Sequence, residues 1–179
     1  DKTNLNFETS DNISNSNNVL DSTKPTLSGT SPADDSTNIA VNGDIELTFS
    51  EAVDVESGYI TIKKSSDDSE FEKIDVTSTQ VEGDGTNVIT INPANTFAST
   101  TQYYVEIDST AFDDSSSNSF AGISDKTSLS FTSADVEAPT LSSTSPSDDS
   151  TNIAVNDDIE LPFSEAVDRG KGNIYIKKS

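Results

Sequence analysis

The sequence predicts an all-β protein, an antiparallel β-sandwich of about seven short strands that occurs in tandem repeats. Three observations lead to this class. The 179 residues are rich in Ser, Thr, Asn and Asp, and β-branched residues take the place of Leu-rich helical stretches. Apolar and polar residues alternate in short runs, which are separated by turn-forming stretches such as "EGDGTN". A long segment of the chain also occurs twice.

The repeat defines the expected organisation. Residues 25–65 recur without a gap as residues 139–179, and the opening "DKTNLNFETSD" matches "DKTSLSFTSAD" at 125–135. Because the later of these two matching segments is expected to be the last strand of a repeat, the opening segment is interpreted as the last strand of a preceding one. The predicted parts are a terminal strand at 1–11, a flexible linker at 12–24, a complete domain at 25–138 and the first half of a following repeat at 139–179.

Each run of alternation within 25–138 marks an expected strand. The runs are, in chain order, 26–30 with 38–41 as a split first strand, then 44–50, 58–64, 71–77, 86–92, 102–108 and 127–133. In the run 44–50, alternation places Ile45, Leu47 and Phe49 on one face. In the run 71–77, Phe71 and Ile74 break strict alternation, which predicts a β-bulge.

The later runs alternate in the same way and supply the rest of the core. Their inward-facing residues are expected to be Ile60 and Ile62, Ile89 and Ile91, Tyr103, Val105 and Ile107, and Leu129 and Phe131. The predicted core therefore contains Phe49, Ile60, Ile91, Tyr103, Val105 and Phe131. Alternation predicts that Tyr104 is a lone ring on the surface.

The second copy departs from the first at two places. Pro162 stands where the first copy has Thr48, and "RGK" replaces "VES". A proline removes a donor from the hydrogen-bond ladder of a strand. Either this donor position faces away from a neighbouring strand, or the second copy has an altered edge.

The second copy also contains apolar residues that lack an opposing sheet. We expect this face to consist of Ile159, Leu161, Phe163, Ile174 and Ile176. Two explanations stay open. The natural chain continues beyond residue 179, or a neighbouring molecule donates a strand to complete the sandwich, with residues 2–8 as a conceivable donor.

The combined motifs resemble a known family. "PTLSGTSPADDSTNIAVNGDIELTFSEAVD", followed by "GYITIKK", "YYVEIDSTAFDD" and "FAGISDKTSLSFT", is similar to the bacterial Ig-like domains that occur in tandem in S-layer proteins and large adhesins. The resemblance implies an Ig-like sandwich that acts as a spacer or stalk in an extracellular or cell-surface protein of bacteria. Its implied partners are neighbouring repeats or copies of itself. The alternatives are an adhesin module that binds a surface glycan or protein, and a fibre or sheath subunit that assembles by strand exchange.

Several other functions find no support in the sequence. The absence of His and Cys removes Ser-His-Asp and Cys-His catalysis and the usual zinc sites, and no phosphate-binding motif is present. We therefore expect no enzyme. The formal charge of −22, from 32 acidic and 10 basic residues, repels nucleic acid and anionic membranes, and no apolar run is long enough to span a bilayer.

Calcium is the one cofactor that the sequence suggests. Ca²⁺ needs about 6–8 oxygen ligands, and acidic residues are placed in the expected loops. In an Ig-like sandwich, Glu51, Asp54, Asp113 and Asp114 should converge at one end. The opposite end is expected to carry Asp34, Asp35, Asp67 and Asp68, and to face Glu165 and Asp168 across a junction that contains Asp135 and Glu137. Calcium would bridge these acids and stiffen the array; the alternative is a solvated acidic surface.

Overall fold

A computed structural model describes residues 21–177, which form two compact units, 21–134 and 135–177. The predicted terminal strand at 1–11 and the linker up to residue 20 lie outside the described residues. Among the described residues, no helix has the length and apolar character needed to cross a membrane.

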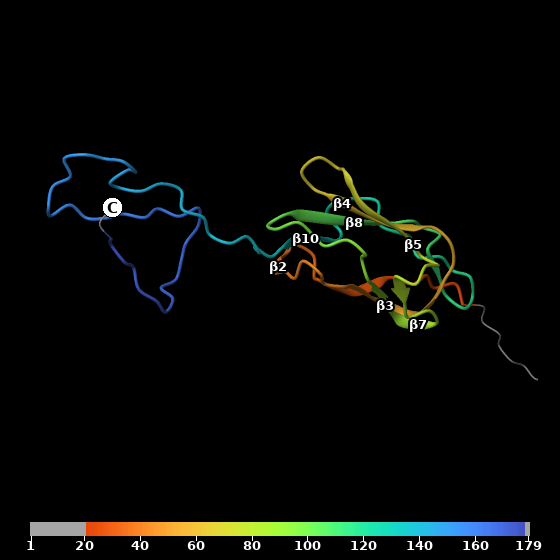
Figure 1. Ribbon diagram of the computed structural model, residues 1–179. Coiled ribbons are helices and arrows are strands. Elements are labelled where there is room, and N and C mark those ends of the chain that lie inside the picture. The colour runs from red at the N-terminus through yellow and green to blue at the C-terminus, as the bar shows by residue number, and fades with distance from the viewer. Residues whose placement is uncertain (1–20, 178–179) are drawn as a thin grey trace, which may run out of the picture. The chain divides into compact units, whose positions relative to one another are not determined.

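The first unit is an all-β sandwich of two sheets (Figure 1). Its strands are β1 Leu27–Ser31, β2 Ser36–Ile39, β3 Ile45–Val55, β4 Tyr59–Lys64, β5 Glu70–Asp75, β6 Val81–Glu82, β7 Thr86–Ile91, β8 Gln102–Ile107, β9 Phe112–Asp113 and β10 Ser130–Ser133. One sheet has the order β1-β3-β7-β6, with β9 pairing the far end of β3, and the other has the order β2-β10-β8-β4-β5. The sandwich prediction is confirmed, and the short strands β6 and β9 are additions to it.

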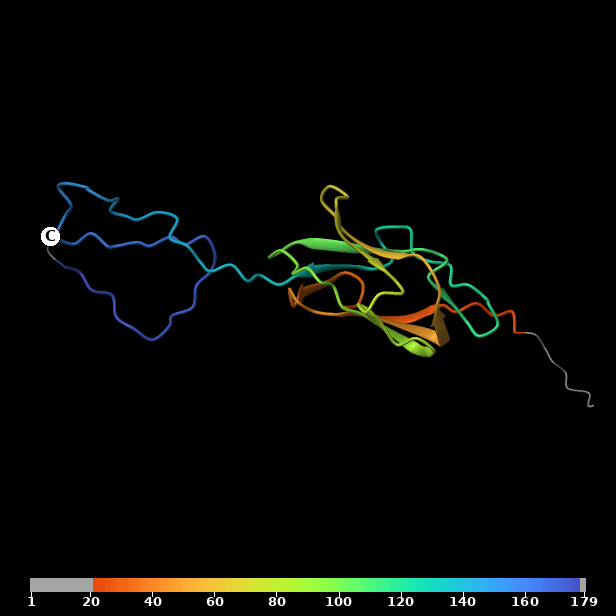
Figure 2. The same ribbon diagram turned by 45° about the vertical axis from the view of Figure 1, so that its right-hand side comes forward.

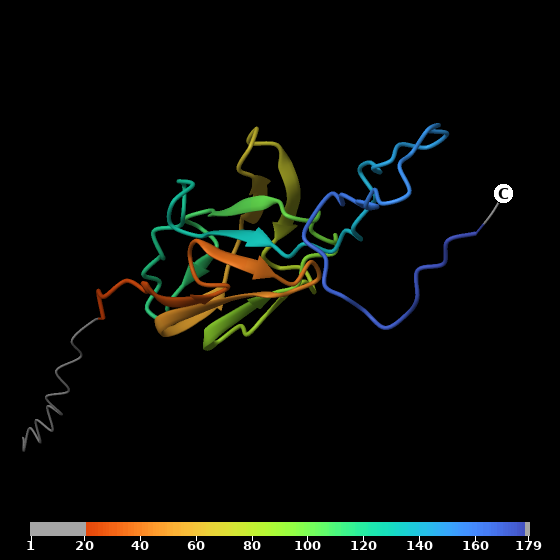
Figure 3. The ribbon, with the colours of Figure 1, turned by 90° about the vertical axis from the view of Figure 1, so that its left-hand side faces the viewer.

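The first strand is split, as predicted, and its two parts lie in different sheets. β1 pairs antiparallel with β3, and after a turn β2 pairs parallel with β10 in the opposite sheet. Figure 3 shows β2 and β10 side by side with their arrows pointing the same way. The chain enters this unit at one end of the sandwich and leaves it at the other (Figures 1 and 2).

The core lies between the sheets and contains every residue predicted for it. Phe49, Ile60, Ile91, Tyr103, Val105 and Phe131 are all buried. Loop residues that strand periodicity does not reveal complete this core. The ring of Phe97 lies 5.2 Å from that of Phe131, and the ring of Phe120 lies 5.2 Å from that of Phe49. The buried hydroxyl of Tyr103 accepts a hydrogen bond from the Ala98 amide at 2.9 Å.

The predicted bulge is present in β5. Ile62 pairs with Glu72, but the next residue, Lys63, pairs with Glu70, so Phe71 is the extra residue. The bulge turns the ring of Phe71 towards that of Tyr103, 4.9 Å away. The bulge therefore gives an aromatic contact to a position that strict alternation would turn outward.

The prediction that Tyr104 is a lone surface ring is wrong, because its side chain is only 2% exposed. Alternation does place it on the outer face of its sheet, but neighbouring side chains cover it there. The amines of Lys63 and Lys126 lie 5.9 and 5.5 Å from the ring centre. The Tyr104 hydroxyl donates to Asp68, which also forms an ion pair with Lys126.

The second unit repeats the β1–β3 strand pairing of the first unit. Leu141 pairs with Phe163, and Ser145 pairs with Glu160. These are the same register positions as in the β1–β3 pairing of the first unit, shifted by 114 residues.

Pro162 lies in the second of these two paired segments. Alternate residues of an antiparallel strand direct their amides to opposite neighbours. Glu160 exchanges two hydrogen bonds with Ser145, at 2.8 and 3.0 Å, so position 162 faces the same strand. Pro162 therefore lacks a donor only toward this edge strand, and its carbonyl still accepts from the Ser142 amide at 2.8 Å. The opposite side of the strand is unaffected.

Apolar side chains of the second unit are exposed. Phe163 is 39% exposed, whereas Phe49 at the same position of the first unit is 2% exposed. The residues predicted to lack an opposing sheet, Ile159, Leu161, Phe163, Ile174 and Ile176, are all exposed. In the first unit, β7, β8 and β10 supply the residues that cover the corresponding positions.

Candidate metal centre

Three carboxylates converge at the end of the first unit where the chain enters. Ligand oxygens of Asp21, Glu51 and Asp114 all lie within 4.8 Å of one another. These residues come from widely separated parts of the unit: the segment before β1, the second half of β3, and the loop after β9. The sandwich topology therefore assembles the cluster.

The loop after β9 fixes one of these carboxylates. Asp114 is 5% exposed, and its Oδ1 accepts hydrogen bonds from the amides of Ser116 and Asn118, both at 2.8 Å. The Asn118 side-chain amide donates to Asp114 Oδ2 at 2.8 Å and to the Asp21 carbonyl at 3.1 Å. Asn118 thereby holds two members of the cluster together.

Glu51 lies where the pairing of β3 changes. The register between β3 and β7 shifts between Thr48 and Val53, and beyond this point β3 pairs with β9. Because the shift interrupts regular pairing at this position, the side chain of Glu51 can face the loop that follows β9.

The electrostatics of the cluster favour a cation. Desolvation, followed by the charges of Asp21 and Asp114, raises the pKa of Glu51 above its ordinary value. The hydrogen bonds from Asn118 lower the pKa of Asp114, so that carboxylate stays charged. A group of two or three negative charges with oxygen ligands suits a hard cation such as Ca²⁺.

Of the four acids predicted for this end, the structure places two in the cluster. Glu51 and Asp114 belong to the cluster, and Asp54 and Asp113 are direct partners in the β3–β9 pairing. Asp21 was not among the predicted residues. The repeat contains a signal for it, because Asp21 and Asp135 occupy the same repeat position. Each also accepts a hydrogen bond from the amide two residues later, at 2.9 and 3.0 Å.

The acids predicted for the opposite end bind protein groups instead. Asp34 accepts from the Ser130 amide at 2.8 Å, and Asp35 accepts from the Ser130 hydroxyl at 2.9 Å. Asp67 accepts from the amide and hydroxyl of Ser69. Asp68 pairs with Lys126. Within residues 21–177, these four acids form no group of three whose ligand atoms lie as close together as those around Glu51.

The remaining predicted acids belong to the second unit. Asp135, Glu137, Glu165 and Asp168 are exposed, and Asp135 accepts from the Glu137 amide in the turn described above. The expectation that calcium bridges the two units stays a prediction.

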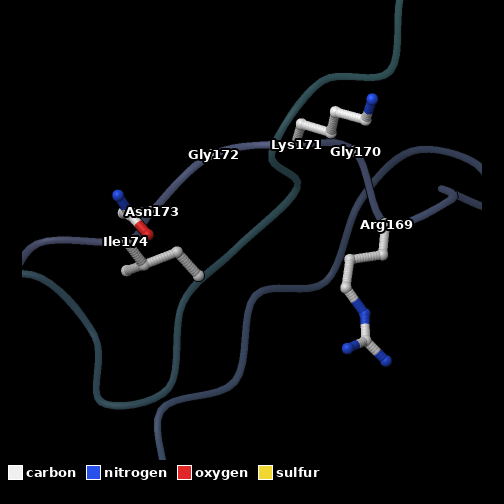
Figure 4. A pocket seen from close by; sticks show the side chains of 6 residues that line it. All are labelled: Arg169, Gly170, Lys171, Gly172, Asn173 and Ile174. Carbon is white, nitrogen blue, oxygen red and sulfur yellow. The ribbon is translucent and has the colours of Figure 1, made fainter.

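A surface hollow in the second unit is lined by one continuous segment (Figure 4). The lining residues are Arg169, Gly170, Lys171, Gly172, Asn173 and Ile174. The side chains of Arg169 and Lys171 point in different directions, so their charges do not converge on one position. This arrangement gives no defined anion site.

Comparison with known proteins gives a family match. A family model described as "Bacterial Ig-like domain" matches residues 21–133 and again residues 135–178. No curated protein sequence matches the chain significantly.

Two solved structures are similar in fold at low sequence identity. CopC from Methylosinus trichosporium OB3b is 19% identical, with a TM-score of 0.43, over 64% of this chain and 97% of its own. The S-layer protein rSbsC(31-844) is 14% identical, with a TM-score of 0.42, over 68% of this chain and 16% of its own.

Proposed function

Because the chain belongs to the bacterial Ig-like domain family, we propose that it is a spacer module of a large repetitive protein, secreted by bacteria or displayed on their surface. Modules of this family are non-enzymatic, and we infer that this chain catalyses no reaction. The proposed role is mechanical: each repeat adds length between an anchor and a distal part.

One observation carries this proposal. The same strand pairing occurs twice along the chain in the same register, with Leu141–Phe163 matching Leu27–Phe49. In addition, the first unit receives and releases the chain at opposite ends (Figure 2). A module with this path adds length with each copy, whereas a module whose ends lie together would not.

Small-angle scattering tests the spacer role. Chains in which the segment 25–138 occurs once, twice and three times should increase in maximum dimension by a constant step. A control chain in which a Gly/Ser linker of equal length replaces one copy should be more compact, because such linkers behave as random coils. Arrays that collapse, so that added copies bring no added length, would contradict the proposal.

A ligand-binding adhesin module is the first alternative. An adhesin module could stack a sugar ring on an exposed tyrosine. Among the tyrosines of the first unit, Tyr103 and Tyr104 are buried, and Tyr59 is substantially exposed. The lysine amine of Lys73 already lies 4.0 Å from the centre of the Tyr59 ring. A glycan array probed with the chain tests this role, and specific binding would favour it over the spacer.

The second alternative is a fibre subunit that assembles by strand exchange. The exposed apolar face of the second unit favours it, because such a face can accept strands from a neighbour. Mass measurement over a range of concentrations, with and without residues 1–11, tests it. Concentration-dependent oligomers that depend on residues 1–11 would support the fibre.

We further propose that the carboxylate cluster binds Ca²⁺. In a calorimetric titration we expect the chain to bind Ca²⁺, and Glu51→Gln to weaken the binding by removing one charge from the group within 4.8 Å. Glu46→Gln, the same change at an exposed glutamate of the same strand that lies outside the cluster, is the control. Absence of binding at millimolar Ca²⁺, or equal binding by both variants, would show that the acids are a solvated surface.

A further inference from the structure

β2, the second part of the split first strand, is bound to β10, the last strand of the first unit. β2 and β10 form the one parallel pair among the described strands. Phe131 pairs with Ser36, and Ser133 pairs with Ile39. The Ala134 amide adds a hydrogen bond to the Ile39 carbonyl at 2.7 Å. The second part of the first strand is therefore bonded directly to the strand from which the chain leaves the unit.

A pull on the ends of the unit acts along this pair. From the end where it enters the unit, the chain passes through β1, which is paired with β3, and then reaches β2; it leaves β10 at the other end (Figures 1 and 3). Because the two strands run in the same direction, a pull on the incoming and outgoing chain slides one along the other. Sliding loads all their hydrogen bonds together, whereas separating the strands from one end would break the bonds one at a time.

Side chains add a second set of bonds at the start of this pair. The turn before β2 forms hydrogen bonds with Ser130, the first residue of β10. The Asp35 amide donates to the Ser130 carbonyl at 2.8 Å, and the Ser130 amide donates to Asp34 Oδ1 at 2.8 Å. The Ser130 hydroxyl donates to Asp35 Oδ1 at 2.9 Å and to Asp34 Oδ1 at 3.2 Å. Ser130 is 3% exposed, so little water can replace these partners.

The other end of β10 is fixed to the body of the sandwich. Ser133 is buried, and its hydroxyl donates to the Ala98 carbonyl at 2.5 Å and accepts from the Thr101 amide at 2.9 Å. The Ser133 amide donates to the Thr101 carbonyl at 3.0 Å. β10 therefore cannot move toward the outgoing chain without breaking bonds on both of its sides.

The turn that carries the two aspartates recurs in the second unit. Asp149 has a φ of 59° and Asp35 a φ of 58°, both in the left-handed region that costs energy for a residue with a side chain. The repeated "DDSTNIAVN" thus forms the same turn in both units. This strained geometry aims the two carboxylates of the first unit at Ser130.

We propose that β2 and β10, locked by Asp34, Asp35 and Ser130, form a force-bearing clamp that resists extension of the module through its ends. The inference rests on the proposed spacer function, because a spacer between an anchor and a load is pulled through its ends. Acids that the sequence suggested as calcium ligands then have a mechanical role.

Single-molecule force spectroscopy on the full chain tests the clamp, with handles at the two termini. Forced unfolding is governed by the unfolding rate, which rises when bonds broken in the transition state are removed. We expect Ser130→Ala, which deletes the hydroxyl contacts to both aspartates, to shorten the lifetime of the first unit at constant force by about tenfold. Asp34→Ala should act in the same direction. If neither variant folds, the two pulling directions described below test the clamp on the native residues.

A matched control lies off the path of the load. Asp75, the last residue of the edge strand β5, accepts hydrogen bonds from the amide and hydroxyl of Thr77, at 2.9 and 2.8 Å. Asp75→Ala removes bonds of the same kind and should leave the lifetime under force nearly unchanged. Equal effects of Ser130→Ala and Asp75→Ala would overturn the proposal.

Changing the direction of pulling gives an independent test of the clamp. The chain contains no cysteine, so an introduced pair selects the points of attachment. Asn42 follows β2 and Val136 follows β10, and both are exposed. Pulling on Asn42→Cys and Val136→Cys separates the strands from one end, and should unfold the unit at a clearly lower force than pulling through the termini. Equal forces in the two directions would also overturn the proposal.

The clamp and the spacer role fail in different experiments. The clamp is measured on one chain under load, and it is wrong if the unfolding force depends on neither Ser130 nor direction. The spacer role is measured by scattering from arrays without load, and it is wrong if added copies do not add length.

Discussion

The repeat places the same residue type in two environments, which isolates the contribution of burial. Phe49 is 2% exposed and packs against the rings of Phe112 and Phe120, at 5.5 and 5.2 Å. Phe163 occupies the same position of the second unit and is 39% exposed. Any difference between the two phenylalanines therefore reflects what surrounds them, since the neighbouring sequence is nearly the same.

We predict that Phe49→Ala lowers the free energy of unfolding of the first unit by about 3–5 kcal/mol, because it leaves a cavity between packed rings. Phe163→Ala is the matched control and should change the stability of the first unit by less than about 0.5 kcal/mol. Urea unfolding followed by circular dichroism measures both. A small loss for Phe49→Ala would contradict the burial that the structure assigns to this ring.

Glu72 is a buried acid with a structural task. It is 8% exposed, and its carboxylate accepts from the amides of Ala94 and Asn95 and from the side chains of Gln80 and Asn95, at 2.7–3.0 Å. Burial alone would raise the pKa of Glu72, but these hydrogen bonds outweigh burial and lower it. The charged carboxylate therefore holds the loop after β7 against β5.

We predict that Glu72→Gln lowers the free energy of unfolding by about 1.5–3 kcal/mol at pH 7, because one amide hydrogen-bond donor replaces an acceptor. The pKa of Glu72 is lower in the folded state than in the unfolded state. Its contribution is therefore complete above the unfolded value of about 4.3, and is lost as the pH falls through the folded value. Unfolding curves from pH 7 to pH 3 should converge for the two proteins. Glu70→Gln, the same change at an exposed glutamate of β5, is the control, and a gap that stays constant with pH would contradict the assignment.

At the scale of elements, the sequence predicts the regular features of the fold well. Period-two alternation locates β3, β4, β7 and β8, and the interrupted alternation at Phe71 locates the bulge, because both follow from the direction of side chains in a strand. β6 and β9 are each two residues long and too short to show a period. Tyr104 was misplaced because its cover comes from Lys126, far away in sequence.

The sequence predicted only some residues of the carboxylate cluster, because contacts between distant segments do not show in a sequence pattern. Glu51 and Asp114 were expected in two loops at one end of the sandwich. Asp114 does lie in a loop, whereas Glu51 lies within β3, which continues to Val55. Asp21 lies before the first strand, where no pattern shows the path of the chain, and Asn118 contributes through a contact across 97 residues. Asp34 and Asp35 were predicted as ligands because the sequence shows that they are acids. It does not show that both already accept hydrogen bonds from Ser130.

The two faces of β3 give a prediction about proline. The amide of Thr48 faces the edge strand β1, as that of Pro162 does in the second unit, whereas the amide of Leu47 faces the central strand β7. We predict that Thr48→Pro still folds and loses about 1–3 kcal/mol, since it leaves one acceptor of the edge strand unpaired. Leu47→Pro should prevent folding of the unit, because it breaks the ladder at the centre of the sheet. Circular dichroism and urea unfolding separate the outcomes, and equal behaviour of the two variants would contradict the assigned directions.

At the scale of the whole molecule, the fold depends on contacts between distant segments. The sheet opposite Ile45, Leu47 and Phe49 includes β8 and β10, which begin 53 and 81 residues after Phe49, at Gln102 and Ser130. Such non-local contacts cannot form within one hairpin. The second unit has the strand pairing equivalent to β1–β3 in the correct register, and its apolar side chains are nonetheless exposed. Correct local pairing is therefore not sufficient to bury a core in this fold.

This dependence predicts different protease sensitivity for the two units. Chymotrypsin cleaves after large apolar and aromatic residues in segments that can open, and opening costs least where few apolar contacts are buried. In a dilute solution of the chain we expect early cleavage near Phe163 and Tyr175, which are exposed, and a resistant fragment that contains Phe49 and Tyr103, which are buried. Mass spectrometry of the fragments over time measures this order. Protection of 139–177 in the dilute monomer would contradict the prediction, since it would mean that the monomer itself covers the apolar face. Protection that arises only at high concentration would instead indicate assembly, and deletion of residues 1–11 would then test whether that segment is the donated strand.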